Sequence, residues 1–171
     1  MIIREAALSD AEGIAKVHVD CWRTTYKNII SDDFLNKLSY EQRTKLWVQN
    51  ISREDNYVYV AENEEGKIIG FTDGGKEKSG KYPGYDGDVT SIYILKEYQG
   101  LGIGRKLLRQ LFKKFISLNI HSAIVWVLKD NNSRFFYERL GAKIVVDNEL
   151  VKIGNDNLKL MAYGWESIDK V

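Results

Sequence analysis

The sequence predicts an α/β protein in which helices cover a mixed β-sheet of about seven strands. A β-branched and aromatic run from Asp88 to Leu95 precedes a glycine-rich turn, and a helix with a broad apolar stripe follows and extends through Ile116. The continuous apolar run Ala123 to Leu128 comes next, which predicts a parallel strand–helix–strand crossover. Earlier in the chain, Tyr57 to Ala61 and Lys67 to Thr72 flank a polar turn and predict an antiparallel hairpin.

The composition is typical of one globular domain that spans residues 1–171. Hydrophobic residues make up 44% and charged residues 29% of the chain, and its formal net charge of +1 argues against a general nucleic-acid binder. No apolar run is long enough to cross a bilayer. Cys21 is the only cysteine, so an intrachain disulfide is excluded and a reducing compartment is expected. We therefore expect a cytoplasmic protein that binds neither nucleic acid nor membrane.

The N-terminal part is predicted to form one short strand and three helices. Ile2 to Ala6 is the strand, and Ser9 to Glu12 has the pattern of a capping box that starts the first helix. A short second helix is expected around Phe34 to Leu38, and Ser39 to Gln42 is a second capping box. On the first helix, a lone histidine or cysteine is more often core or rim than catalyst, and no Cys-His-acid or Ser-His-acid set accompanies them.

Beyond the hairpin, Gly74 to Gly87 holds five glycines and the only proline, which predicts a surface loop that is either a binding element or a mobile connection. Asn131 or Asn132 is expected to cap the last helix, and Gly141 to end it in a left-handed conformation. Ile144 to Asp147 and Leu158 to Tyr163 are predicted as the last two strands.

Three glycines, Gly100, Gly102 and Gly104, alternate at the start of the central helix. They remove side chains that would keep a ligand from the backbone, and the free N–H groups and the helix dipole favour phosphate there. The alternative is a flexible connection without a ligand. Arg105 favours phosphate, but it breaks both the Walker and the dinucleotide patterns; the dinucleotide reading survives only weakly, with Asp130 as its acidic partner.

The pattern Gln99-x-x-Gly102-x-Gly104, which follows a strand, resembles the acetyl-CoA pyrophosphate loop of the GNAT-type N-acetyltransferases. A second block, Asn131 to Ala142, resembles the family's Asn…Phe-Tyr-Glu-x-x-Gly-Phe segment, with Ala142 in place of the common Phe. The resemblance is strongest between Asp88 and Ala142. It implies a three-layer fold whose mostly antiparallel sheet is splayed at its central parallel pair, with acetyl-CoA as cosubstrate and no metal.

The resemblance also implies which residues hold the cosubstrate. The strand end would pair with the pantetheine arm, the turn would hold the pyrophosphate, and the last helix would complete the site. If Ser133 is aligned with the family's small residue, Asp130 takes the asparagine position, so either Asp130 or Asn131 is the contact. The implied residues are Ile92, Tyr93, Ile94, Gln99, Gly100, Leu101, Gly102, Ile103, Gly104, Arg105, Asn131, Ser133 and Tyr137.

Two residues are implied to carry the chemistry. Tyr137 falls where the family has its general acid, and a phenol with a pKa of about 10 stays protonated at neutral pH and can donate to a departing thiolate. The alternative for Tyr137, which lies between other aromatics, is a core tyrosine. Asp88 begins the central strand where many relatives have Glu. It is either a base that acts through water, a group that binds a cationic acceptor, or a strand cap.

The acceptor wall is implied to come from Trp22 and Tyr26 on the first helix and from Tyr82 and Tyr85 in the loop before the central strand. Aromatic rings beside the Asp88 carboxylate suit a cationic amine, either a small molecule or a protein amino group. The alternative is that Trp22 and Tyr26 are core aromatics. Two other functions stay open: a non-catalytic acyl-CoA-binding module and, third, a nucleotide-binding oxidoreductase. The oligomeric state stays open between a monomer and a homodimer.

Overall fold

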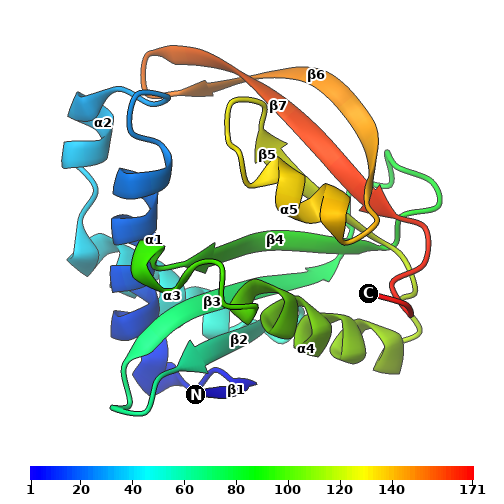
Figure 1. The fold of residues 1–171 in the computed structure, drawn as a ribbon, viewed down its shortest axis with the longest axis horizontal. Coiled ribbons are helices and arrows are strands. Elements are labelled where there is room, and N and C mark those ends of the chain that lie inside the picture. Colours follow the sequence, from blue (N-terminus) through cyan, green and yellow to red (C-terminus); the bar gives the residue numbers. More distant parts are fainter.

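The computed structural model describes residues 1–171, and a mixed sheet of seven strands lies at its centre (Figure 1). The strand order is β1-β2-β3-β4-β5-β7-β6, and every neighbouring pair is antiparallel except β4 and β5. This confirms the predicted mixed sheet. The strands are β1 (Ile2–Glu5), β2 (Tyr57–Glu62), β3 (Ile68–Lys76), β4 (Gly87–Ile94), β5 (Ala123–Leu128), β6 (Lys143–Ile153) and β7 (Asp156–Trp165).

The central parallel pair is splayed. β4 and β5 pair only from Gly87 with Ala123 to Val89 with Val125, although both strands continue beyond these residues. On its other side, β4 stays paired with β3 up to Ile94. The edge of β4 that faces β5 is therefore unpaired over its second half, which leaves its backbone groups free for another partner.

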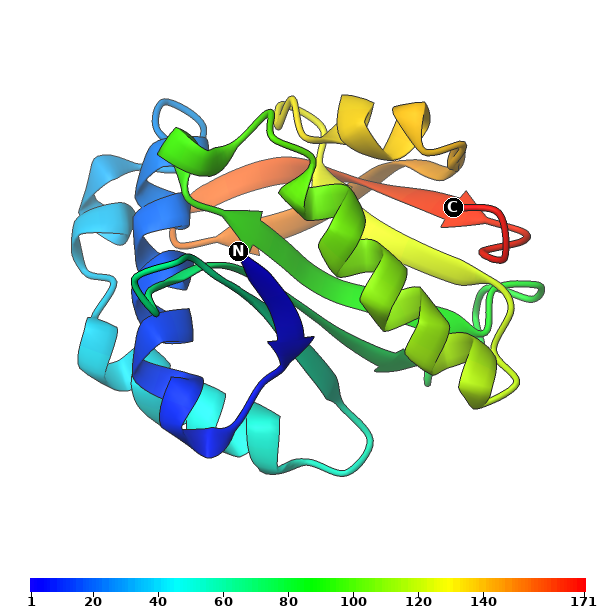
Figure 2. The same ribbon diagram turned by 60° about the horizontal axis from the view of Figure 1, so that its bottom comes forward.

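Helices cover both faces of the sheet (Figure 2). One face carries α4, and the other is packed against α1 and α3, so the fold has three layers. No helix has the length and apolarity that a bilayer crossing requires. The helices are α1 (Ala11–Thr25), α2 (Asp32–Asn36), α3 (Tyr40–Ser52), α4 (Ile103–Ser117) and α5 (Arg134–Arg139), with 3₁₀ turns at Leu8–Asp10 and Lys96–Tyr98.

Side chains alternate between the two faces along each strand. Residues that lie opposite one another in a pair share a face, so Phe71 of β3 and Tyr93 of β4 both point toward α1. We call this side the α1 face. Phe71 packs edge-on against Trp47 of α3, with ring centroids 4.8 Å apart. On the opposite face, Val125 and Val127 of β5 belong to the cluster that buries α4.

Among the strands that are longer than predicted are β3 and β6. β3 continues to Lys76, because Gly74 and Gly75 pair with β4 instead of starting the predicted loop, which shrinks to residues 77–86. A Cβ at Gly74 would collide with the Asp88 carbonyl oxygen, so the strand continues there only because the residue is glycine. β6 extends to Ile153 rather than ending at Asp147, and it pairs with β7 along this length.

The predicted helix caps are confirmed in part. The Ser39 hydroxyl accepts a hydrogen bond from the Gln42 N–H at 3.2 Å, and Gly141 is left-handed, with φ of +89°. The box at Ser9 was wrong, because the helix begins at Ala11. The last helix begins after Ser133, whose side chain makes no capping hydrogen bond, whereas the predicted cap Asn131 accepts from the Ser133 N–H through its side chain at 2.9 Å, one turn before the helix.

Candidate active site

A cavity of about 620 Å³ lies where β4 and β5 separate. Its walls come from the end of β4, the glycine turn, the first turn of α4, and the segment from Asp130 through α5. All but one of the residues predicted to hold the cosubstrate line it; the exception, Leu101, is 64% exposed. Sequence reasoning missed five of the lining residues: Thr25, Tyr98, Asn132, Phe136 and Arg139.

The glycine turn leaves backbone N–H groups open at the cavity. Gly100 and Gly102 have φ values of +77° and +80°, and a Cβ at either position would point into open space. Gly102 precedes α4, and no side chain caps that helix. The first N–H groups of α4 have no partner within the helix, so they and the helix dipole are available to an anion. The turn therefore fits a phosphate group.

Two further contacts shape the turn. The Gln99 side-chain amide donates to the Ile94 carbonyl oxygen at 3.0 Å, which holds the turn against the end of β4. A Cβ at Gly104 would lie 3.1 Å from side-chain atoms of both Ile94 and Phe136, so a glycine there lets α4 approach β4 and α5 closely.

The Tyr137 phenol combines a buried ring with an accessible hydroxyl. The residue is 5% exposed, and its ring packs edge-on against Phe136 and Trp165. No protein group hydrogen bonds to the Tyr137 hydroxyl. The only fully buried side-chain polar atom without a hydrogen-bond partner is Trp22 Nε1, so the Tyr137 oxygen is not fully buried. Because Tyr137 lines the cavity, its oxygen is accessible from there. Burial raises the pKa of Tyr137 well above its usual value, which keeps the phenol protonated.

The aromatic end of α1 adjoins this cavity. The hydroxyls of Tyr26 and Tyr93 lie 3.0 Å apart, and the Trp22 ring meets the Tyr26 ring edge-on at 4.9 Å. His18 stacks against Tyr93, and its Nδ1 accepts a hydrogen bond from Trp47 Nε1 at 3.0 Å. The structure thus brings Trp22 and Tyr26 next to Tyr93, as predicted for the acceptor wall, although Tyr26 is also largely buried.

The two loop tyrosines have different surroundings. Tyr82 packs edge-on against Trp126 of β5 at 5.5 Å. Alternation along β5 places Trp126 on the same face as Leu128, which clusters with Tyr26 on the α1 face. Tyr85 instead packs over Gly164 of β7. Gly164 lies opposite Ile124, which shares a face with Trp126 and Leu128, so both loop tyrosines lie on the α1 side of the sheet, with Tyr85 farther along β5 from Leu128 and Tyr26.

Asp88 lies at the start of β4 and does not line the cavity. Its carboxylate accepts a hydrogen bond from the Thr90 hydroxyl at 2.9 Å. Burial raises the pKa of Asp88, and the nearby charge of Glu77 adds to this effect. Asp88 is therefore a weaker acid than an exposed aspartate, and it lies four residues before Ile92, the first β4 residue that lines the cavity.

Sequence reasoning missed a second carboxyl group, Asp73, which is 2% exposed. It accepts hydrogen bonds from the Ser91 hydroxyl and from Asn56 Nδ2, the latter at 3.1 Å. The only sign of Asp73 in the sequence is that an acidic residue stands within the apolar strand β3. The sequence pattern does not show which residues lie opposite it.

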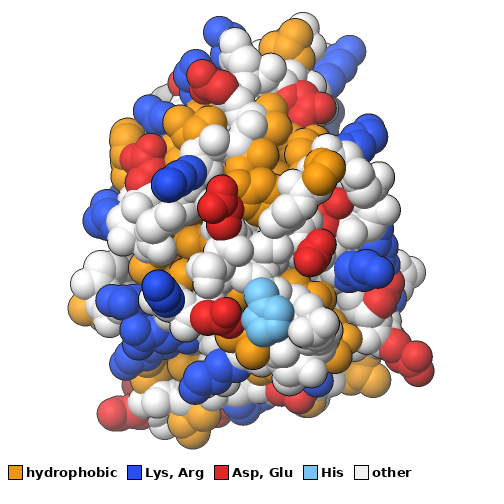
Figure 3. Space-filling model, turned by 90° about the vertical axis from the view of Figure 1, so that its right-hand side faces the viewer, with side chains coloured by type: hydrophobic (Ala, Val, Ile, Leu, Met, Phe, Trp, Pro, Cys, Tyr) orange, Lys and Arg blue, Asp and Glu red, His pale blue; other side chains and the backbone are white.

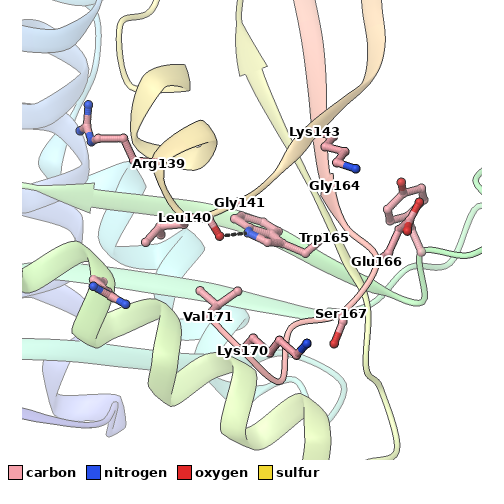
Figure 4. Close-up of a pocket in the computed structure, with 12 residues that line it drawn as sticks. Arg139, Leu140, Gly141, Lys143, Gly164, Trp165, Glu166, Ser167, Lys170 and Val171 are labelled. Carbon is pink, nitrogen blue, oxygen red and sulfur yellow. Dashed lines mark hydrogen bonds between the residues drawn. The ribbon is translucent and has the colours of Figure 1, made fainter.

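A second pocket of about 480 Å³ lies between α5 and the C-terminal segment (Figure 4). Trp165 borders it and donates to the Leu140 carbonyl oxygen at 3.0 Å. Arg105 and Arg139 line both this pocket and the first cavity. The surface at the right of Figure 1 mixes acidic and basic side chains (Figure 3). No group of three or more His, Cys, Asp or Glu side chains is arranged to hold a metal ion.

The unpaired edge of β4 and the glycine turn that opens the N-terminus of α4 are features that suit a phosphate-bearing acyl carrier. The family model described as "Acetyltransferase (GNAT) family" matches residues 16–142. The chain therefore belongs to the GNAT acetyltransferase family, and it is an acyltransferase, as its resemblance implied.

Individual relatives agree with this assignment. The chain is 39% identical over 166 residues to the "Uncharacterized N-acetyltransferase YuaI" of Bacillus subtilis (strain 168), covering 97% of this chain and 93% of that protein. It is 30% identical over 115 residues to a "Probable spermine N(1)-acetyltransferase" of Bacillus subtilis subsp. natto, covering 62% and 72%. The PaiA N-acetyltransferase of Thermoplasma acidophilum, solved in complex with coenzyme A, has the same fold, with a TM-score of 0.72, 22% identity and coverage of 96% and 98%.

Proposed function

We propose that this protein transfers an acetyl group from acetyl-CoA to a primary amine of a small molecule or a protein. The observation that carries the proposal is the cavity between β4 and β5, where an open phosphate-binding turn, an unpaired strand edge and the accessible Tyr137 hydroxyl meet. The unpaired edge at Ile92–Ile94 suits the amide groups of pantetheine, which can pair with a backbone as an added strand does. The coenzyme A complex of PaiA supports this choice of carrier.

The turn would hold the pyrophosphate through the N–H groups that follow Gly102. Arg105 and Arg139 would add positive charge at the mouth of the cavity. Asn131 and Asp130 both line the cavity, so the choice between them rests on chemistry. The Asn131 side chain already accepts from the Ser133 N–H at 2.9 Å, which leaves its amide N–H groups to donate to the carrier, whereas an ionised Asp130 cannot donate.

Tyr137 would act as the general acid. Because its pKa is raised by burial, the phenol is protonated at neutral pH, and its hydroxyl has no protein partner to compete with the departing sulfur. The amine would attack from the α1 face, where Trp22 and Tyr26 lie beside Tyr93 near the end of β4 and Tyr82 packs against Trp126 of β5. Asp88 would attract a cationic acceptor there. The relative named as a probable spermine acetyltransferase supports such an acceptor.

The test measures thiol release from acetyl-CoA in the presence of spermidine, lysine, an aminoglycoside or a peptide with a free N-terminus, with mass spectrometry of the acetylated product. We expect at least one of these amines to be acetylated. Stabilisation of the protein by acetyl-CoA in a thermal-shift assay, without acetylation of any amine, would support the alternative of a non-catalytic acyl-CoA-binding module instead.

A further inference from the structure

We propose that Ser91 and Asp73 form the relay that removes the proton from the acceptor amine. This inference rests on the proposed function, and it assigns the base of that reaction to a residue pair on the α1 face of β3 and β4. Asp73 lies opposite Ser91 in the pairing of these strands, so both side chains point to the same face as Phe71 and Tyr93. That face is the one where Trp22 and Tyr26 lie.

The hydrogen bond between the pair has a defined direction. The Ser91 hydroxyl donates to Asp73 Oδ1, and Asn56 Nδ2 donates to Asp73 Oδ2. Asp73 is 2% exposed, whereas Ser91 is only partly buried. The Ser91 oxygen therefore keeps its lone pairs for a further partner on the α1 face, while its proton is already directed at the buried Asp73 carboxylate.

A β-bulge in β4 sets the position of Ser91 and Asp73 along the strand, next to the residues that line the cofactor cavity. The register of β3 and β4 shifts between Asp73, which pairs with Ser91, and Gly74, which pairs with Val89. Thr90 is therefore bulged out of the ladder, and bulges re-aim side chains next to active sites. Ser91 directly precedes Ile92, the first β4 residue that lines the cofactor cavity. Asp88 lies three residues farther from that cavity.

The charges around Asp73 make its carboxyl a usable base. Burial, with a smaller effect from the negative charge of Asp88 on β4, raises the pKa of Asp73 to about 6. The hydrogen bonds from Ser91 and Asn56 and the charge of Arg53 at the end of α3 act in the opposite direction. Ser91 and Asn56 are its neutral partners. A carboxyl group with a pKa near neutrality is ionised at pH 7 and still accepts a proton readily.

The proton then follows a balanced path. The acceptor enters as an ammonium ion and gives one proton to Ser91 Oγ while the Ser91 proton passes to Asp73, which returns it to solvent. The neutral nitrogen then bonds to the acetyl carbon, and its second proton follows the same route to Asp73. The carbon–sulfur bond breaks, and the thiolate takes the proton of Tyr137. Asp73 returns its proton to solvent and Tyr137 regains one, so the products are the amide and the thiol. Asp73 acts through Ser91 and is a positioning residue and proton sink.

The experiment compares Asp73→Asn and Ser91→Ala with the wild type, using whichever amine of the panel the wild type acetylates. We expect kcat/KM to fall by about 10²-fold in both variants, and the acid limb of its pH profile, set by Asp73, to disappear in Asp73→Asn. Ser91→Thr, which keeps the hydroxyl, should retain at least about ten times the Ser91→Ala rate. Asp169→Asn, an exposed aspartate beside His121, is the matched control and should keep the wild-type profile.

Each outcome decides the proposal. Weakly basic hydroxylamine, neutral at pH 7, should be acetylated by both variants with a smaller relative loss than an alkylamine, because it needs less help to lose its proton. Wild-type rates and an unchanged acid limb in both variants would overturn the relay while leaving the transferase function intact. If the wild type acetylates no amine, the transferase function fails and the relay fails with it. Because Asp73 is buried and its substitution can impair folding, Ser91→Ala at a partly exposed position tests the same relay independently.

Discussion

The Tyr26 hydroxyl on α1 and the Tyr93 hydroxyl on β4 lie 3.0 Å apart, so a hydrogen bond joins the first helix to the strand beside the cofactor cavity. Tyr26 is 7% exposed, and Tyr93 lines the cavity. Burial raises the pKa of both phenols, and the charge of an ionised Tyr26 raises the pKa of Tyr93 further. The pair therefore stays neutral and connects the acceptor wall to the cofactor wall.

A double-mutant cycle tests this connection. Tyr26→Phe and Tyr93→Phe should each lower the free energy of unfolding by about 1 kcal/mol, because each leaves a buried hydroxyl with fewer partners. The double variant should lose less free energy of unfolding than the two single variants together, because the second substitution removes the hydroxyl that the first one left without a partner. Urea unfolding measures all three values. Strictly additive losses would show that the two hydroxyls do not interact in solution.

Tyr137→Phe separates chemistry from packing. The change removes one oxygen and leaves the ring between Phe136 and Trp165, so we expect the melting temperature to stay near that of the wild type. Turnover should fall by about 10²-fold if the phenol protonates the thiolate. Acetyl-CoA binding, measured by calorimetry, is the control and should hardly change. A variant with normal turnover would exclude Tyr137 as the acid.

Gly102 offers a test of the phosphate-binding turn. Its φ of +80° disfavours a β-branched residue, and a Cβ there would stand in open space beside the cavity that Gly102 lines. Gly102→Val should therefore raise the acetyl-CoA dissociation constant by at least about 10-fold. Gly102→Asn is the matched variant, because asparagine tolerates the left-handed conformation, so it separates backbone strain from obstruction. Unchanged affinity in the valine variant, with the fold intact, would contradict the assignment of the turn.

Local patterns predicted the parts of the site that are continuous in sequence. The strand, glycine turn and helix from Gly87 to Ser117 are local, because alternation, glycine spacing and the apolar stripe each report on neighbouring residues. The resemblance added Tyr137, which lies on a different element. Asp73 could not be found in this way. Its role depends on the register of β3 against β4, including the bulge at Thr90, and neither leaves a mark in the sequence.

Local sequence patterns also failed to predict where the strands end. Glycine usually interrupts a strand, so Gly74 and Gly75 predicted a loop. In the fold, the backbone of a neighbouring strand or turn lies where their side chains would be, which turns the same glycines into a requirement for pairing. The separation of Tyr82 from Tyr85 has a similar cause, because only the packing of the loop on β5 and β7 distinguishes them.

His18 should make the protein sensitive to acid. Its folded-state pKa is lowered by burial to about 4, below the ordinary value of 6.5, and Arg43 adds to the effect. The unfolded chain therefore binds the proton first, so stability falls as the pH drops from about 6.5 to about 4, by up to roughly 3 kcal/mol. His18→Gln, whose amide oxygen can still accept from Trp47, should lose less stability over this range in urea titrations. His121→Gln, at the only other histidine, is exposed and should behave as the wild type.

The last prediction concerns the acceptor, which should bind on the α1 face. Trp22→Ala removes a ring beside Tyr26, and Asp88→Asn removes the negative charge at the start of β4. Both should raise KM for the acetylated amine by about 10-fold, and Asp88→Asn should do so most for a polycationic amine such as spermidine. KM for acetyl-CoA should stay near the wild-type value in both, because neither residue lines the cofactor cavity.

The loop tyrosines supply the matched pair for this measurement. Tyr82 packs against Trp126, whereas Tyr85, on the same face of the sheet, packs over Gly164 at the edge of the second pocket, farther from Leu128 and Tyr26. Tyr82→Ala should therefore raise the acceptor KM, while Tyr85→Ala should lower the melting temperature without changing that KM. If Tyr85→Ala alone alters acceptor binding, the amine approaches from the side of β7. The acceptor site would then have to be assigned to the surface between the loop and the C-terminal segment.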